Sequence, residues 1–204
     1  MESFAAASQV YAGGLIFARV AAIVMLLPGI GDTSVPPRVR LAFAFLMALM
    51  LMPVVARGMP VPPDVSGVAG AVIKELMIGL MIGGILKIFL SSLSTTGEII
   101  SIQTTLAFAQ TAAPGQASPS TTIGTFLGLI GITLIMATDL HHMFLTAIVR
   151  SYAIFPFGRE IPIADSAQLA VQTVAGSFKL GLQLAAPVVV FSLVFNIAAG
   201  LVGR

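Results

Sequence analysis

The chain has no cysteine, no tryptophan and very few charged residues. Only 9% of its 204 residues are charged, and the whole chain has just two tyrosines. The lack of cysteine excludes disulfide bonds, thiolate metal ligands and a cysteine nucleophile, and it leaves the redox compartment undetermined. The lack of tryptophan removes the aromatic belt that marks the interfaces of many membrane proteins. A net charge of +2, with no basic cluster, argues against a nucleic-acid partner.

Apolar residues fill most of the chain instead. They make up 57% of the sequence, and the mean hydropathy is +1.04, whereas a soluble domain is about a quarter charged. Ionisable residues nevertheless interrupt most apolar stretches before they reach the about 20 residues that a spanning helix needs. Because a charge in lipid costs at least about 2.5 kcal/mol on insertion scales, we expect many segments to face protein or water. The composition predicts an all-α, integral-membrane-type helical bundle packed among other subunits.

Five helices are expected, at residues 4–27, 38–56, 65–107, 121–153 and 166–203, with a kink or break in the third near Ser91–Gly97. Clusters of proline and glycine mark the connections between them. No internal repeat or composition shift indicates a second domain, so residues 1–204 are predicted to form a single membrane-associated helical domain. The N-terminus lacks the basic region of a cleavable signal, and we expect the first apolar stretch to remain in the mature protein.

The longest stretch without an ionisable residue runs from Ile99 to Thr138. Its middle, Gln110–Thr122, is rich in helix-breaking proline and glycine and in hydroxyl and amide side chains. An exposed loop would normally carry Lys, Glu or Asp. We therefore predict that this loop is held inside a protein assembly.

Two pairs of glycines spaced by four residues lie on either side of this loop. Gly79 and Gly83 precede it, and Gly124 and Gly128 follow it. Small residues at this spacing let helix backbones approach closely. One pair alone would be weak evidence of close helix packing, because glycine is common in membrane helices. Two flanking pairs predict tight packing of the hairpin.

Polar residues in the fourth apolar segment form a candidate site. Asp139, His142, Thr146 and Arg150 share one face of a continuous helix, whereas His141 points elsewhere. A proton relay or a metal site is one interpretation, because an intramembrane Asp and His can titrate or bind metal. However, adjacent histidines do not share a helical face, and no third ligand has zinc-site spacing. We therefore assign Asp139, His141 and Arg150 to a polar interface, either as intersubunit hydrogen-bonding groups or as the interfacial end of a segment, and predict no metal and no cofactor.

Glu75 is a further candidate for this polar interface. It follows Lys74 directly, and neighbouring residues point apart on a helix, so each is expected to meet a partner across an interface. The serines lack a Gly-x-Ser-x-Gly elbow, and no catalytic residue is predicted.

A series of short motifs follows in order along the chain. The most informative are Phe17–Val20, Val35–Arg40, Glu75 with Gly79 and Gly83, Gly97–Gln103, Leu106–Ala109, Asp139–His141, Phe155–Gly158 and Asn196–Leu201. This series resembles the FliR family of type III export-gate proteins, which has flagellar and virulence members. The resemblance covers essentially the whole chain, and the overall similarity favours the flagellar branch.

The resemblance implies a non-enzymatic subunit of the export gate in the bacterial inner membrane, at the flagellar basal body. Family members form a closed helical assembly of tilted hairpins with FliP-like and FliQ-like subunits, with an FlhB-like switch protein as a further partner. Unfolded exported proteins pass through this assembly, and membrane lipid surrounds it. The resemblance maps the pore plug loop onto Phe108, Ala109, Gln110, Thr111, Pro114, Gly115, Gln116, Ser118, Pro119 and Ser120.

The chain departs from the family pattern in three places. Ala113 stands where an acidic residue is expected, and Asp139-Leu140 stands where Asn-Gly is expected. Family members normally continue through a further helical hairpin, so we expect this chain to lack it. A secondary transporter or ion channel that uses Asp139 and His141 on a small substrate is the alternative, although no inverted repeat is evident. A less favoured alternative is an intramembrane hydrolase.

Overall fold

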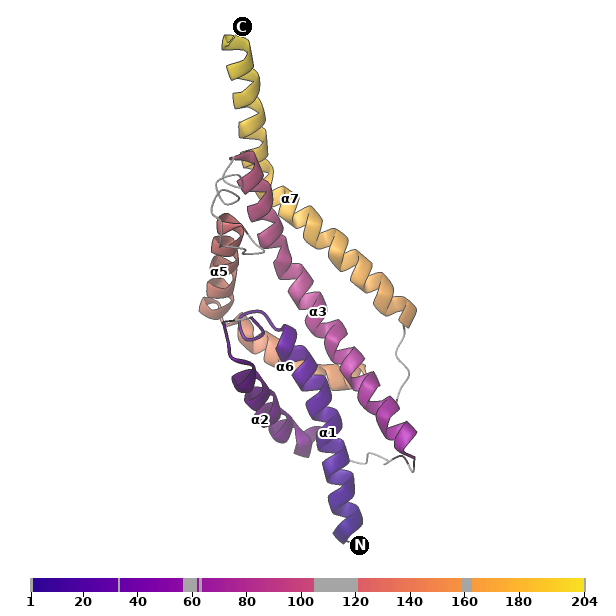
Figure 1. Ribbon diagram of the computed structural model, residues 1–204. Coiled ribbons are helices and arrows are strands. Elements are labelled where there is room, and N and C mark those ends of the chain that lie inside the picture. The colour runs from indigo at the N-terminus through magenta and orange to yellow at the C-terminus, as the bar shows by residue number, and fades with distance from the viewer. Residues whose placement is uncertain are drawn as a thin grey trace. The chain divides into compact units, whose positions relative to one another are not determined.

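The computed structural model describes residues 2–32, 34–56, 62, 64–104, 121–158 and 163–203. All regular elements in these ranges are α-helices, and these ranges contain no strand, as the sequence predicts. The helices are α1 (Glu2–Leu26), α2 (Pro37–Val55), α3 (Val65–Gln103), α5 (Thr122–Ala137), α6 (Leu140–Ile154) and α7 (Ile163–Val202) (Figure 1).

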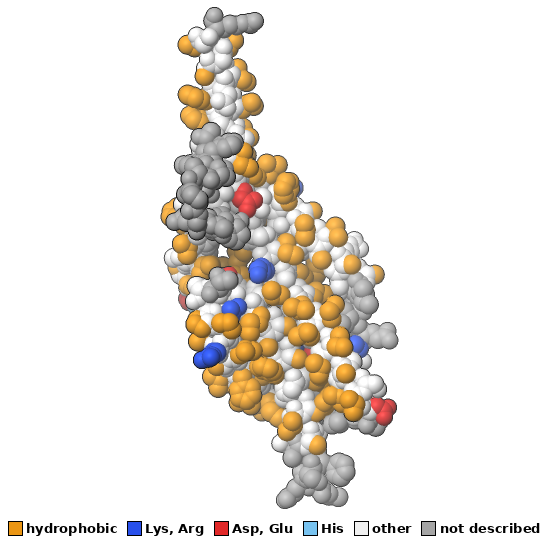
Figure 2. Space-filling view, in the orientation of Figure 1, with side chains coloured by type: hydrophobic (Ala, Val, Ile, Leu, Met, Phe, Trp, Pro, Cys, Tyr) orange, Lys and Arg blue, Asp and Glu red, His pale blue; other side chains and the backbone are white. Residues whose placement is uncertain are grey.

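Several of these helices are long and apolar enough to cross a membrane. They are Ala7–Leu26 of α1, the whole of α2 and α3, and Ala164–Val202 of α7; α5 and α6 would add a fifth span if they act together as one bent pair. Hydrophobic side chains cover much of the face shown in Figure 2, with few charged groups among them. Helices that are apolar on all sides are typical of a membrane or of the centre of a large assembly. The prediction of a membrane-type helical bundle is therefore confirmed.

The third helix differs from the sequence prediction because it continues without a break through Ser91–Gly97. The hydroxyls in this region donate to carbonyls of the same helix. Thr95 Oγ1 lies 3.1 Å from the Ser91 carbonyl oxygen, and Thr96 Oγ1 lies 2.8 Å from the carbonyl oxygen of Ser92. Serine and threonine that bond back in this way are compatible with a continuous helix. A run of polar residues of this kind therefore does not interrupt the helix.

The fourth predicted helix, residues 121–153, is in fact two helices. Asp139 adopts a left-handed backbone conformation, with φ 57° and ψ 16°. A right-handed helix cannot pass through such a residue, and aspartate is one of the few residue types that tolerate it. The break occurs at Thr138 and Asp139, without the glycine or proline that usually signals a break in the sequence.

The chain divides into two compact units, each built from two separate segments. The first unit comprises residues 1–87 and 139–170, and the second comprises residues 88–138 and 171–204. The first contains α1, α2, α6 and the N-terminal part of α3, and the second contains α5, the remainder of α3 and most of α7. No composition change along the sequence could mark units that interleave in this way.

The core of the first unit forms around α1. Its buried residues come from α1, α2 and α6 and are Ile16, Val20, Ile23, Val24, Leu27, Ala44, Ala48, Leu51, Ile148 and Tyr152. The spacing of the α1 members places them on one helical face. The side chain of Phe17 adds an edge-to-face contact with Phe45 of α2, with ring centroids 6.1 Å apart. This packing makes α1 the central helix of the unit.

Candidate functional site

A buried arginine lies at the centre of the first unit. Arg19 is three residues after Ile16 and four before Ile23, so it projects from the core face of α1, and it is fully buried. Its Nε donates to Oε2 of Glu75 in α3 at 2.5 Å, and both side chains are at most 3% exposed. Charged groups are seldom buried unless they are paired. This ion pair therefore joins α1 to α3.

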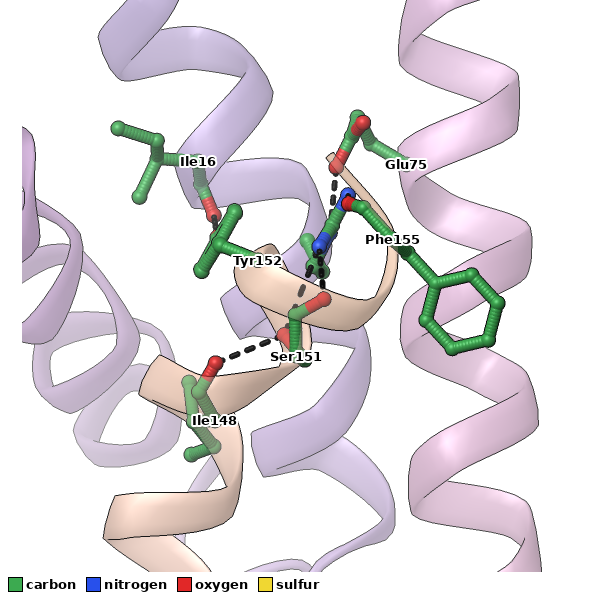
Figure 3. A network of polar contacts seen from close by, with 7 residues as sticks. Ile16, Glu75, Ile148, Ser151, Tyr152 and Phe155 are labelled. Carbon is green, nitrogen blue, oxygen red and sulfur yellow. Dashed lines mark hydrogen bonds and ion pairs between the residues drawn. The ribbon is translucent and has the colours of Figure 1, made fainter. Parts of the chain in front are cut away.

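The remaining donors of Arg19 bind the C-terminal end of α6. Nη1 donates to the Ser151 carbonyl at 3.2 Å, and Nη2 donates to the Phe155 carbonyl at 2.9 Å. Figure 3 shows this end of α6 next to Glu75. The Ser151 carbonyl also accepts a hydrogen bond from the Phe155 amide at 2.8 Å, and a cation at this end of the helix opposes the negative end of the helix dipole. One guanidinium group thus connects α1, α3 and α6.

Aromatic rings complete the surroundings of this guanidinium. Arg19 Cζ lies 4.2 Å from the ring centroid of Tyr152 and 5.4 Å from that of Phe157. The Tyr152 hydroxyl in turn donates to the Ile16 carbonyl at 3.4 Å. Cation–π contacts of this kind are stronger when the cation is removed from water. The arrangement holds helices together. The Ser151 hydroxyl within it donates to the Ile148 carbonyl of its own helix, at 2.7 Å.

The partner of Glu75 belongs to another helix of the same chain. Its carboxylate is paired inside the chain with Arg19, 56 residues earlier in the sequence. Residue spacing can pair groups on one helix but cannot pair groups that are so far apart. The signal in the sequence was Arg19 itself, a charged residue on the apolar face of the first helix.

The first pair of predicted packing glycines brings α3 against α1 beside this ion pair. A Cβ on Gly79 would lie 2.6 Å from both the Arg19 carbonyl oxygen and the Ala22 Cβ, and one on Gly83 would lie 2.9 Å from the Leu26 Cβ. Only glycine allows the two backbones to come so close. The neighbour of these glycines is α1, and α5 takes no part in the contact.

The second pair lies in the second unit, at the start of α5. Gly124 lies directly against Gly97 of α3, so close that a Cβ on Gly97 would overlap the Gly124 backbone nitrogen and Cα. A Cβ on Gly128, in contrast, would meet no described atom within 4 Å. Thr121 caps α5, because its hydroxyl accepts a hydrogen bond from the Gly124 amide at 3.1 Å. The contact between Gly97 and Gly124 therefore joins the two helices that lead into and out of the uncharged loop.

Residues 105–120, which include all of the uncharged loop except Thr121 and Thr122, lie outside the described residues. This applies to all the predicted plug residues, namely Phe108, Ala109, Gln110, Thr111, Pro114, Gly115, Gln116, Ser118, Pro119 and Ser120. The described residues on its two sides are Thr104, which follows α3, and Thr121 before α5.

Asp139 and the two histidines lie together at the start of α6. One possible ligand atom from each of Asp139, His141 and His142 lies within 4.8 Å of the other two. Adjacent residues were expected to point apart on a helix, yet the rings of His141 and His142 lie close together. Their ring centroids are 4.1 Å apart. Arg150 lies further along α6 with an exposed side chain.

Comparisons with known proteins give a consistent family assignment. Residues 10–204 match the family of bacterial export proteins, family 1. The chain is 60% identical over 205 residues to the flagellar biosynthetic protein FliR of Caulobacter vibrioides, an alignment that covers 100% of this chain and 82% of that protein.

More distant relatives carry the same description. The flagellar biosynthetic protein FliR of Escherichia coli K12 is 28% identical over 91% of this chain and 71% of its own length. The protein of that name from Bacillus subtilis is 24% identical over 93% of this chain and 74% of its own length. The chain therefore belongs to the FliR family of flagellar biosynthetic export proteins.

Proposed function

We propose that this chain is a non-enzymatic core subunit of the flagellar type III export gate in the bacterial inner membrane. In this role it forms the channel with FliP-like and FliQ-like subunits, contacts an FlhB-like switch protein and passes unfolded exported proteins. The observation that supports this role most directly is the amount of apolar helix surface that the chain does not cover itself. Only 6% of the apolar window of α7 and 17% of that of α2 are buried within the chain.

Helix length favours protein partners over lipid alone as the cover for this surface. α7 has 40 residues and α3 has 39, so each is about 60 Å long at about 1.5 Å per residue. The hydrocarbon core of a bilayer is about 30 Å thick. Even a strongly tilted helix of this length would extend well beyond that core. The C-terminal part of α7 also runs past the end of α3 within the second unit (Figure 1), which leaves it available to neighbouring subunits.

We further propose that Phe108–Thr122 acts as a movable seal of the channel. The loop carries no ionisable residue. A fixed charge in a constriction would attract ions and would bind oppositely charged cargo. Small polar side chains can separate and close again without such interactions. The Gly97–Gly124 contact and the Thr121 cap would hold the two stems while the loop between them moves.

The mass of the complex after mild detergent extraction tests the subunit assignment. We expect a large particle that contains FliP-like and FliQ-like proteins together with this chain. Transport of a small substrate by the purified single chain in liposomes would favour a transporter instead. Extraction as a monodisperse single chain from cells that produce all the partners would contradict the proposal.

The seal is tested by deletion of Gln110–Ser120 in the assembled complex. Ion conductance of cells or proteoliposomes should rise, because the constriction would lose its cover. A variant with a Gly/Ser segment of equal length keeps the stems connected and separates the effect of the side chains from that of chain length. The mass of each variant complex serves as the control for assembly. Unchanged conductance after deletion from an intact complex would count against a seal.

A further inference from the structure

The start of α6 holds an unassigned cluster of metal-ligand side chains. His141 and His142 are the only two histidines of the chain, and Asp139 lies beside them. One donor atom from each residue lies within 4.8 Å of the other two. His142 Nδ1 lies 3.9 Å from Asp139 Oδ1. Asp139, in its left-handed conformation, is the N-cap residue of α6, and the two histidines lie in the first turn of that helix.

Two of these side chains have polar atoms that no protein group satisfies in the described part of the chain. Asp139 occupies the N-cap position of α6, yet its carboxylate makes no capping hydrogen bond. At 3.9 Å, its approach to His142 is too long for a hydrogen bond. Nδ1 of His141 is buried and has no hydrogen-bond partner among the described residues. Buried polar atoms normally have a partner, so this unpaired nitrogen is a candidate ligand atom.

The geometry is close to that of a metal site. Zinc binds histidine nitrogen at about 2.0–2.1 Å and carboxylate oxygen at about 2.0–2.2 Å, so tetrahedral donors lie about 3.3 Å apart. The observed separations are larger by about 1.5 Å or less. The side chains of His142 and Asp139 are 68% and 79% exposed, and rotation about their side-chain bonds can supply this difference.

We propose that Asp139, His141 and His142 bind one divalent transition-metal ion, with Zn²⁺ the best match. Two imidazoles and one carboxylate suit zinc and the neighbouring transition metals. Mg²⁺ and Ca²⁺ prefer sites built from oxygen ligands alone. Three protein ligands leave a fourth coordination position for water or for a group from a neighbouring subunit. The bound ion would tie the residue at the helix break to the first turn of α6.

The composition of the chain makes this proposal straightforward to test. The absence of cysteine and of any further histidine removes other thiolate and imidazole sites. The complete chain, purified in detergent with a histidine-free tag and stripped with a chelator, would be titrated with Zn²⁺ against a chromophoric competitor. Co²⁺ would be titrated in parallel and followed by its visible absorption. We expect saturable uptake of one equivalent of each metal.

Variants test the ligand assignment. Asp139→Asn and His142→Gln should each weaken Zn²⁺ binding by at least about tenfold, since loss of even an outer-shell partner costs about 10–100-fold in affinity. Asp165→Asn removes an exposed aspartate of α7 and is the matched control. It should leave the affinity unchanged. Far-ultraviolet circular dichroism confirms that each variant is folded.

A measurement on the unmodified chain provides an independent check. Its two histidines give two sets of imidazole signals in a histidine-labelled NMR spectrum, and both sets should shift on addition of one equivalent of Zn²⁺. Absence of stoichiometric binding at micromolar Zn²⁺ would overturn the proposal. Equal binding by the double variant H141Q/H142Q would also overturn it. Neither result would bear on the role in protein export.

Discussion

Replacement of Glu75 by methionine would leave the Arg19 guanidinium buried in the first unit without its counter-charge. Both side chains of the pair are almost fully enclosed, so water cannot take the place of the carboxylate. Arginine cannot lose its proton in a protein, and the positive charge would therefore remain. We expect the free energy of unfolding to fall by about 3–5 kcal/mol, the usual cost of removing one partner of a buried pair.

The double variant R19M/E75M shows how much of this loss comes from the unpaired charge. Replacement of a whole buried pair by apolar side chains is neutral or stabilising by about 1–4 kcal/mol. Against this, the hydrogen bonds from Arg19 to the Ser151 and Phe155 carbonyls are lost, at about 0.5–1.5 kcal/mol each. The contact with Tyr152 is lost as well, at about 0.5–2 kcal/mol. We therefore expect the double variant to lose about 1 kcal/mol, much less than the single variant.

Thermal unfolding of the purified chain in detergent, followed by far-ultraviolet circular dichroism, measures these differences. For a chain of this size a change of 1 kcal/mol shifts the midpoint by about 2–4 °C, so Glu75→Met should lower it by about 6–20 °C. Glu98→Met is the matched control, because Glu98 is an exposed glutamate on the same helix. It should change stability by less than about 0.5 kcal/mol.

Two outcomes would refute this reasoning. If Glu75→Met and Glu98→Met unfold at the same temperature, the ion pair does not stabilise the fold. If the double variant is as unstable as Glu75→Met, the loss comes from other contacts of Arg19 or Glu75 rather than from an unpaired charge.

The loop stems give two further predictions, both measured by the same thermal unfolding. Gly97→Ala should destabilise the chain, because its Cβ would overlap the Gly124 backbone; overpacking costs about 1–3 kcal/mol, more than the gain in helix propensity of about 0.8–1 kcal/mol. Gly128→Ala has room for its Cβ and should be neutral or stabilising. Thr121→Ala should cost about 0.5–2 kcal/mol through loss of the α5 cap.

The threonine prediction needs a control on the same helix. Thr133 is a suitable position, because its exposed hydroxyl only donates to the Leu129 carbonyl, at 2.8 Å. Thr133→Ala should therefore leave the midpoint nearly unchanged. Equal losses for Thr121→Ala and Thr133→Ala would argue against a capping role. A stabilised Gly97→Ala variant would argue against the close contact of α3 and α5.

The helices were predictable from the sequence because they depend on local properties. Runs of apolar residues between proline and glycine clusters placed all the long helices close to their observed bounds. The break at Asp139 was not predictable in the same way. Its left-handed conformation occurs in a residue type that also fits inside a helix, and no glycine or proline stands beside it.

The contacts at the candidate site were harder to predict from the sequence. The partner of Glu75 lies 56 residues away, and the glycine that packs against Gly124 belongs to another helix. Spacing rules apply within one element and do not pair residues of different elements. A metal site at Asp139 with the histidines was set aside because adjacent residues point apart on a helix, a rule that describes backbone directions and not the side-chain rotamers that bring the two rings within 4.1 Å.

The sequence by itself determined that this is an apolar, helical membrane protein with an uncharged loop flanked by glycines, because composition and hydrophobic pattern act at every residue. Only the tertiary structure decided which helices those glycines join, that Arg19 is neutralised by Glu75, and that three metal-ligand side chains meet at Asp139. Such contacts depend on how helices approach one another in space. A linear pattern of residues does not specify that approach.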